Sequence, residues 1–477
     1  MRFQDSTELA AGRRGAVWAQ GYAVLSFLSA LAVIGYLDRL TSVLLVLSTF
    51  LFAIVTRYSM RYMMGDPGQR RFMFWLCLTS TFVFALVLAP NLPIFITAWC
   101  GISLSLHQLL QFYGDRPSAL LAARKKFLVS RLGDVALLAV LVLTYQTFGT
   151  WNFQELLAAA EKLRLAGHEN LPAAISGICC LLVFAALLKS AQFPFHTWLP
   201  DTMETPTPVS ALMHAGIINA GGILVIRLSP LISLSNTAML ILCLVGGFTA
   251  IFASSVMLTQ ASIKRCLAFS TVAQMGFMML ECGLGAFHLA LVHLVAHSLY
   301  KAHAFLSSGS AVQSRPTLSQ RPQSLAVVVS SIFAGIALTF LTAQTMSMNP
   351  VHSLALNLIF SIALAQMLWT LFGTIDRGWK VPLGLIAALA MSITYFALDM
   401  VAQLVVKPTS SAANWTGVFI ACILLLAAVA QSQLPRLLHS SLGLKLYVHA
   451  RNGFYLNTLA NRLTSTLWPI GLSKEGI

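Results

Sequence analysis

Charged side chains are scarce in this 477-residue chain: they make up 9% of its residues, while hydrophobic residues make up 57%. Soluble domains average about 25% charged residues, so the composition excludes an ordinary water-soluble globular protein. The chain also lacks the short alternating apolar and polar runs that are typical of a membrane β-barrel. Apolar stretches of about 20 residues, enough to cross a bilayer core as a helix, recur along nearly the whole sequence instead.

Several site signatures are missing as well. The eight cysteines are scattered, and no C-x-x-C pair or Cys/His cluster has the spacing of a zinc site. We find no NADH, quinone or iron–sulfur signature, and therefore predict no metal, no cofactor and no enzymatic activity for this chain. The formal net charge is +15, but the basic residues lie in short loops between apolar spans. That pattern favours a membrane protein over a nucleic-acid-binding one.

The apolar runs predict an all-α, polytopic membrane protein with about 14 transmembrane helices. The predicted spans are 20–37, 41–56, 72–90, 93–113, 127–149, 173–192, 207–228, 231–256, 266–283, 286–308, 324–344, 351–373, 381–405 and 413–432. We assign 1–432 to one transmembrane domain and 433–477 to a cytoplasmic tail, with a helix around Lys445 to Thr466.

The distribution of basic residues predicts the orientation, because loops rich in Lys and Arg stay in the cytoplasm. With the N-terminus inside, the outside loops hold only Arg39, Lys162, Arg164 and Lys407. The inside segments hold most of the others, including Lys125 and Lys126. We therefore predict a multi-pass protein of the bacterial inner membrane, with both termini cytoplasmic.

The stretch from Leu187 to Arg227 differs from an ordinary membrane helix. Lys189 lies deep in an apolar run, where a charge costs roughly 2.5–3.5 kcal/mol on insertion scales and has to face protein or water. Interrupted helices beside a buried charge are typical of transporter ion sites, and four prolines follow: Pro194, Pro200, Pro206 and Pro208. We predict a proton site at Lys189; the alternative is a lysine that reaches the membrane surface from a helix end.

Other titratable residues accompany Lys189. His214 lies in the next span and can exchange a proton near neutral pH, although hydrogen-bonded packing is the alternative. His196, Asp201 and Glu204 lie between the prolines, where a functional role and an exposed loop explain them equally well.

These residues carry a family resemblance. The segment KSAQFPFHTWLPDTMETPTPVSALMHA, from Lys189 to Ala215, resembles the signature of the proton-conducting antiporter-like subunits. That family includes subunit L of respiratory complex I, Mrp antiporter subunits and the membrane subunits of DAB inorganic-carbon transporters. KKFLVSRLGD (125–134) and HLVAHSLYKAHAFLSSGS (293–310) agree with it. The resemblance implies two inverted five-helix repeats with broken helices, at about 72–228 and 231–373.

The resemblance also implies roles for individual residues. Lys189 matches the family's buried central lysine, and His214 matches the histidine of the following helix. The His-x-x-x-His-x-x-x-Lys pattern is matched by His293, His297 and Lys301, whose spacing places them on one helix face. Arg131 and Asp134 match the family's Arg-x-x-Asp, which is spaced for an intrahelical ion pair.

The sequence departs from the family at two places. Cys100 follows Trp99 where other members carry a glutamate that pairs with the central lysine, so we expect Lys189 to lack a nearby carboxylate. His107 is a candidate for a partial substitute. The family's distal lysine is not identifiable, and Asp399 is either its substitute or a residue near a helix end.

The tail motif LYVHARNGFYLNTLANRLT (446–464) resembles the DAB membrane subunits more than complex I. That resemblance implies a large cytoplasmic partner similar to a zinc carbonic anhydrase, which would hydrate CO2 while this chain conducts protons or Na+ between membrane lipids. The alternative is a subunit of a cation/proton antiporter or of respiratory complex I.

Overall fold

The computed structural model describes residues 2–166, 172–309, 324–346, 354–373, 380–409, 414–433, 436 and 439–469. Apart from one isolated bridge between Asn91 and Asn152, these ranges contain no β-structure.

The first half holds the helices that surround Lys189. They are α1 (Arg2–Ala32), α2 (Arg39–Tyr62), α3 (Gln69–Leu88), α4 (Leu92–Leu110), α5 (Pro117–Phe148), α6 (Phe153–Ala166), α7 (Ala173–Lys189), α8 (Trp198–Asp201), α9 (Thr207–Ala215), α10 (Ala220–Arg227) and α11 (Ser229–Ile232).

The second half continues with α12 (Asn236–Met257), α13 (Ile263–Gly283), α14 (Phe287–Leu306), α15 (Leu325–Thr345), α16 (Leu354–Gly373), α17 (Lys380–Gln403), α18 (Asn414–Ser432), α20 (Ser441–Arg451) and α21 (Leu456–Leu467). Here α15 and α16 are each one continuous helix. The predicted bounds of the two inverted repeats stay a prediction.

Within the described ranges, 13 helical stretches are long and apolar enough to cross a membrane, and the shorter apolar helix α7 corresponds to the remaining predicted span. The prediction of a polytopic all-α membrane protein is confirmed. The predicted boundaries differ most from the helices at two spans. The first span lies within 10–32 instead of 20–37, and α5 starts at Pro117 instead of 127, because its first turns carry the basic residues that hydropathy assigned to a loop.

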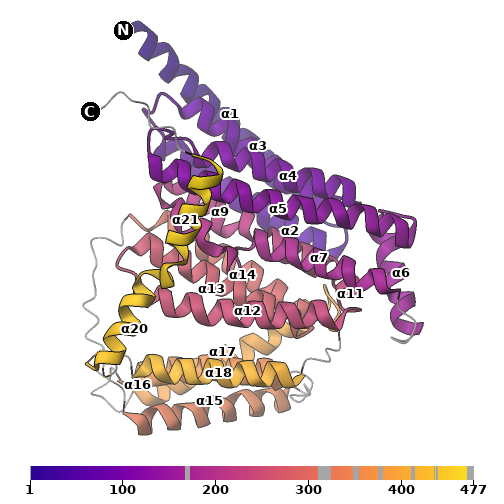
Figure 1. Cartoon of the computed structure of the whole chain (residues 1–477), viewed down its shortest axis with the longest axis vertical. Coiled ribbons are helices and arrows are strands. Elements are labelled where there is room, and N and C mark those ends of the chain that lie inside the picture. The colour runs from indigo at the N-terminus through magenta and orange to yellow at the C-terminus, as the bar shows by residue number, and fades with distance from the viewer. Residues whose placement is uncertain are drawn as a thin grey trace.

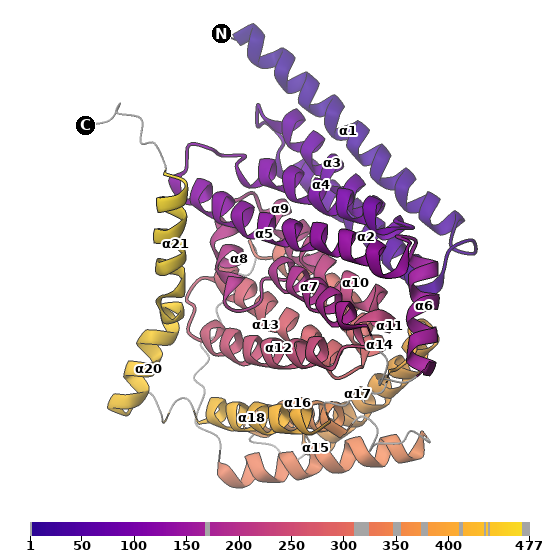
Figure 2. The same cartoon turned by 45° about the vertical axis from the view of Figure 1, so that its right-hand side comes forward.

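The long helices lie roughly side by side, and three others lie at their ends (Figures 1 and 2). α6 covers one end of the stack, while α20 and α21 run across the opposite end. Some neighbours pack backbone against backbone. A Cβ on Gly246 of α12 would come within 2.6 Å of the Leu280 nitrogen in α13, the close approach that small residues permit in membrane helices.

The tail forms two helices where one was predicted. α20 ends at Arg451, and Gly453, Phe454 and Tyr455 take positive φ values of 58°, 50° and 62° before α21 begins. The turn redirects the chain so that Phe454 packs against Phe252 of α12, with ring centres 5.7 Å apart.

Candidate functional site: a buried polar array

The span from 207 to 227 is broken between α9 and α10 by the short 3-10 turn 217–219. A break frees backbone carbonyls, which need other donors at membrane depth. His297 Nε2 donates to the His214 carbonyl at 3.2 Å, and Asn219 Nδ2 donates to the Ala215 carbonyl at 2.8 Å. Side chains of the turn and of α14 therefore supply hydrogen-bond donors to the carbonyls that the break leaves free.

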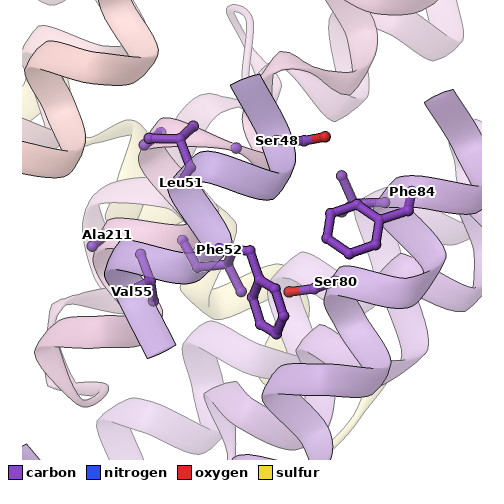
Figure 3. Close-up of a pocket in the computed structure, with 11 residues that line it drawn as sticks. Ser48, Leu51, Phe52, Val55, Ser80, Phe84 and Ala211 are labelled. Atoms are coloured by element: carbon purple, nitrogen blue, oxygen red, sulfur yellow. The ribbon is translucent and has the colours of Figure 1, made fainter. Parts of the chain in front are cut away.

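A small cavity lies against this break, between α2, α3 and α9 (Figure 3). Its volume of about 20 Å³ has room for about one water molecule. The hydroxyls of Ser48 and Ser80 already donate to carbonyls of their own helices. The cavity is too small for any substrate larger than water.

Lys189 is the last residue of α7 and is 8% exposed. Its ammonium lies 4.4 Å from the centre of the Trp99 ring and donates to the Trp99 carbonyl at 3.4 Å. Although it ends its helix, the side chain faces protein and does not reach the membrane surface. The next residue, Ser190, donates to the Ile218 carbonyl at 2.9 Å and joins this helix end to the broken turn.

A carboxylate does act on Lys189, and it comes from α5. Asp134 is the acid whose charge acts most strongly on the Lys189 ammonium. Asp134 Oδ2 also lies 2.7 Å from Arg131 Nη2, which confirms the predicted intrahelical pair. Lys189 forms no ion pair or hydrogen bond with a carboxylate among the described residues. The charge of Asp134 reaches it because this part of α5 packs directly on α7: a Cβ on Gly133 would touch Leu188. Cys100 lies beside Asp134.

His107 does not take the place of the missing glutamate. Its ring packs against Phe127, with ring centres 5.1 Å apart, and its charged neighbours are Lys126, Arg131 and Arg124. His107 therefore belongs to the surroundings of Lys126.

Lys125 and Lys126, assigned to a cytoplasmic loop by the sequence, are each only 3% exposed within α5. Lys126 Nζ donates to the Ser103 carbonyl at 2.7 Å and to the Ser103 hydroxyl at 3.0 Å, and the charge of Lys189 acts on Lys126. Lys126, Arg131 and Lys189 thus share a buried region in which Asp134 supplies negative charge.

Lys125 forms the end of this cluster nearest the tail. Its Nζ lies 2.6 Å from Asp201 Oδ2 and donates to Asn457 Oδ1 at 2.6 Å, while Asn457 Nδ2 donates to Asp201 Oδ1 at 3.0 Å. Asp201 is therefore part of a closed polar contact between α5, α8 and α21. Glu204 lies outside the contact and forms a half-exposed pair with Arg116 at 3.7 Å.

His196 is buried among aromatic rings, with the Phe252 ring centre 5.1 Å away. Burial, together with the charge of Lys125, lowers the pKa of the His196 imidazole to about 4. The ring is therefore neutral at physiological pH.

His214 lies in a second cluster, on the other side of the broken turn from Lys189. Its Nδ1 is 3.1 Å from the Thr271 hydroxyl, which already donates its hydrogen to the Leu267 carbonyl at 3.0 Å. Nδ1 must therefore carry the proton, and Nε2 keeps a free lone pair. Lys301 Nζ donates to the same Leu267 carbonyl at 3.1 Å, so one backbone oxygen connects His214 with Lys301.

The face of α14 continues the cluster. His297 and His293 have ring centres 6.2 Å apart, and His293 Nδ1 lies 2.9 Å from Glu281 Oε2. Because a carbonyl only accepts, His297 is protonated at Nε2. His293 Nε2 has no hydrogen-bond partner among the described residues. The sequence did not single out Glu281.

Asp399 pairs with a histidine at the beginning of α14. His288 Nε2 lies 2.9 Å from Asp399 Oδ1, and both side chains are buried. The structure thus gathers most of the predicted residues into two clusters. The first cluster contains Arg131, Asp134, Lys189 and Cys100. The second cluster contains His214, His293, His297 and Lys301. Apart from Arg131, whose guanidinium stays protonated, each of these side chains can hold or pass a proton.

Known proteins match the same stretch of chain. A family model described as "NADH:quinone oxidoreductase/Mrp antiporter, TM" matches residues 89–375, more than half of the sequence. The chain belongs to this antiporter family. A second model, "NADH-Ubiquinone oxidoreductase (complex I), chain 5 N-terminus", matches residues 30–73.

Relatives within the antiporter family differ in how much they share with this chain. "Probable inorganic carbon transporter subunit DabB2" of Halothiobacillus neapolitanus is 40% identical over 93% of this chain and 82% of its own length. The DabB counterpart of Hydrogenovibrio crunogenus is 44% identical over 58% of this chain and 53% of its own length. NADH-ubiquinone oxidoreductase chain 5 of Metridium senile is 38% identical over 58% of this chain and 45% of its own length.

A solved structure supports the fold. A chain of the Mrp complex from Dietzia sp. superimposes with a TM-score of 0.58 over 99% of this chain and 58% of its own, at 20% identity. The fold shared with that chain therefore extends beyond the residues that the two family models match.

Proposed function

We infer that this chain is the proton-conducting membrane subunit of an energy-coupled complex that accumulates inorganic carbon. One observation carries the proposal. The similarity to the DabB2 protein covers 93% of this chain, whereas the similarity to complex I chain 5 of Metridium senile covers 58%. The proposal places the protein in a bacterial inner membrane with both termini cytoplasmic, as the basic loops predict.

The two polar clusters form the proton path in this proposal. Protons pass between Lys189 and Lys126 in the first cluster and among Lys301, His214, His297 and His293 in the second. Single waters bridge the gaps that are too wide for direct hydrogen bonds. Asp134 supplies negative charge to the region of Lys189 and forms an ion pair with Arg131.

The chemistry on CO2 belongs to a partner in this proposal. A large cytoplasmic subunit similar to a zinc carbonic anhydrase would hydrate CO2, and this chain would supply the driving force. One charge crossing 100 mV releases about 2.3 kcal/mol, which biases an equilibrium almost fiftyfold. One or two protons per turnover would therefore make hydration effectively one-way.

Growth of a carbonic-anhydrase-deficient bacterium in ambient air tests the proposal. Co-expression of this chain with a candidate large cytoplasmic partner should restore growth, and either protein alone should not. Normal membrane insertion of both proteins without rescue in several hosts would contradict the proposal.

The family model also covers Mrp antiporter subunits, so a cation/proton antiporter is the second candidate. A subunit of respiratory complex I belongs to the same alternative. Everted vesicles separate these functions from carbon uptake. Na+-driven dissipation of a pH gradient without any bicarbonate accumulation would favour the antiporter, and NADH-dependent pumping in a larger assembly would favour complex I.

A further inference from the structure

We propose that the Asp399–His288 pair is the terminal proton-exchange site of the path, at the membrane face opposite the tail. The proposal rests on the proposed function and names the residues through which the second cluster meets that face. Neither residue belongs to the His-x-x-x-His-x-x-x-Lys pattern, and the two are 111 positions apart in the sequence.

The pair is built into two membrane helices near their ends. His288 is the second residue of α14, and Asp399 lies one turn before the end of α17. Asp399 Oδ1 accepts from His288 Nε2 at 2.9 Å and from Gln403 Nε2 at 3.2 Å. His288 is 4% exposed and Asp399 is 8% exposed, so both side chains are buried within the protein.

His288 has the free nitrogen that an exchange site needs. Its Nε2 faces Asp399, and its Nδ1 is buried without a hydrogen-bond partner among the described residues. A proton that binds Nδ1 creates an imidazolium, which then releases its Nε2 proton to the Asp399 carboxylate. The ring returns to neutrality in the other tautomer, and one proton has been transferred to Asp399.

Tyr395 connects this pair with the rest of the array. Its ring stacks on Phe360, with ring centres 4.0 Å apart, and its hydroxyl is influenced by the charges of both Asp399 and Glu281. Glu281 in turn contacts His293 at 2.9 Å. Two carboxylate–histidine pairs, each with its histidine on α14, therefore lie near one tyrosine.

The position along α14 indicates a terminal site. His288 and Lys301 are 13 residues apart, which corresponds to about 20 Å along a helix and most of a bilayer core of about 30 Å. Lys301 contacts the beginning of α13, and the loop before α13 contacts the tail through Gln260 and the Arg451 carbonyl. His288 therefore lies at the other end.

Proton flux through the complex of this chain and its partner, reconstituted in liposomes with a pH-sensitive dye inside, tests the proposal. We expect Asp399→Asn to lower the flux at least about tenfold, since the amide cannot take up the proton. Asp399→Glu, which restores a carboxylate, should recover most of it. Glu161→Gln, at the exposed pair with Arg164 on α6, is the matched control and should conduct normally.

A second variant tests whether a loss of proton flux comes from the missing proton site or from misfolding. His288→Gln keeps a donor for Asp399 but cannot bind a proton, and we expect a folded, poorly conducting protein. Wild-type flux in either Asp399→Asn or His288→Gln would overturn the proposal, as would a loss that only follows the amount of folded protein. Lys189→Ala in the same assay distinguishes the failures. If that variant also conducts, the proposed function fails as a whole.

Discussion

The negative charge that acts on Lys189 comes from Asp134 on α5, although the two side chains form no ion pair. Asp134 was predicted as the partner of Arg131, and it also acts on Lys189 because α5 packs on α7. Removal of one member of a buried charge pair typically costs about 3–5 kcal/mol, since the other charge is left uncompensated. Asp134 should therefore matter more than its place in a local pair suggests.

We expect Asp134→Asn to lower proton flux at least about tenfold, because 1.4 kcal/mol in a barrier already gives that factor. Cys100→Glu introduces a carboxylate at the family's position beside Asp134, and it should restore part of the flux in the double variant. Flux measurements on the two single variants and the double variant check this. A double variant no better than Asp134→Asn would show that the position of the charge, and not only its presence, is required.

Several site residues were predictable and others were not, for a common physical reason. Charged or titratable groups are rare inside apolar runs, so the sequence indicates Lys189, His214 and the three residues on one face of α14: His293, His297 and Lys301. Glu281 and His288 were missed because each acquires its role from a partner on another helix, which the sequence spacing does not reveal. Lys126 was misassigned because a run of basic residues resembles a solvated loop.

At the scale of helices, the break between α9 and α10 depends on close packing against α7. A Cβ on Gly221 would come within 2.3 Å of the Ser190 hydroxyl and 2.4 Å of the Ala186 carbonyl, which is backbone and cannot move aside. A Cβ on Gly222 would meet only the end of the flexible Met278 side chain, at 2.4 Å. The two adjacent glycines therefore differ in how well each position tolerates an added methyl group.

We expect Gly221→Ala to destabilise the protein by about 1–3 kcal/mol through overpacking, and to misplace Lys189. Gly222→Ala is the matched control and should cost clearly less, because Met278 can change rotamer. Thermal unfolding of both variants in detergent measures the difference. Equal melting temperatures for the two variants would contradict this account of the α7–α10 contact.

Helix positions were largely predictable, since apolar length and composition determine which segments cross a bilayer. The residue at which α5 begins and the division of the tail into two helices were not predictable in this way. Pro117 starts α5 ahead of the charged residues, and the turn at Gly453–Tyr455 depends on the aromatic contact with Phe252.

For the whole molecule, the distribution of charge predicts that α6 and the tail lie on opposite sides of the membrane. Figures 1 and 2 place them at opposite ends of the helix stack. We expect Lys162→Cys on α6 to react with a membrane-impermeant maleimide in intact cells, and Lys445→Cys on α20 to react only after permeabilisation. The unsubstituted protein controls for its native cysteines. The reverse labelling would invert the orientation.

The buried Lys189 is central to the proton path, and its replacement is the most direct test. Lys189→Ala should abolish inorganic-carbon uptake by the complex in whole cells, with normal amounts of protein in the membrane. Lys162→Ala, at an exposed lysine on α6, should leave uptake unchanged. Wild-type uptake by the Lys189→Ala variant would contradict the existence of a proton path through this site.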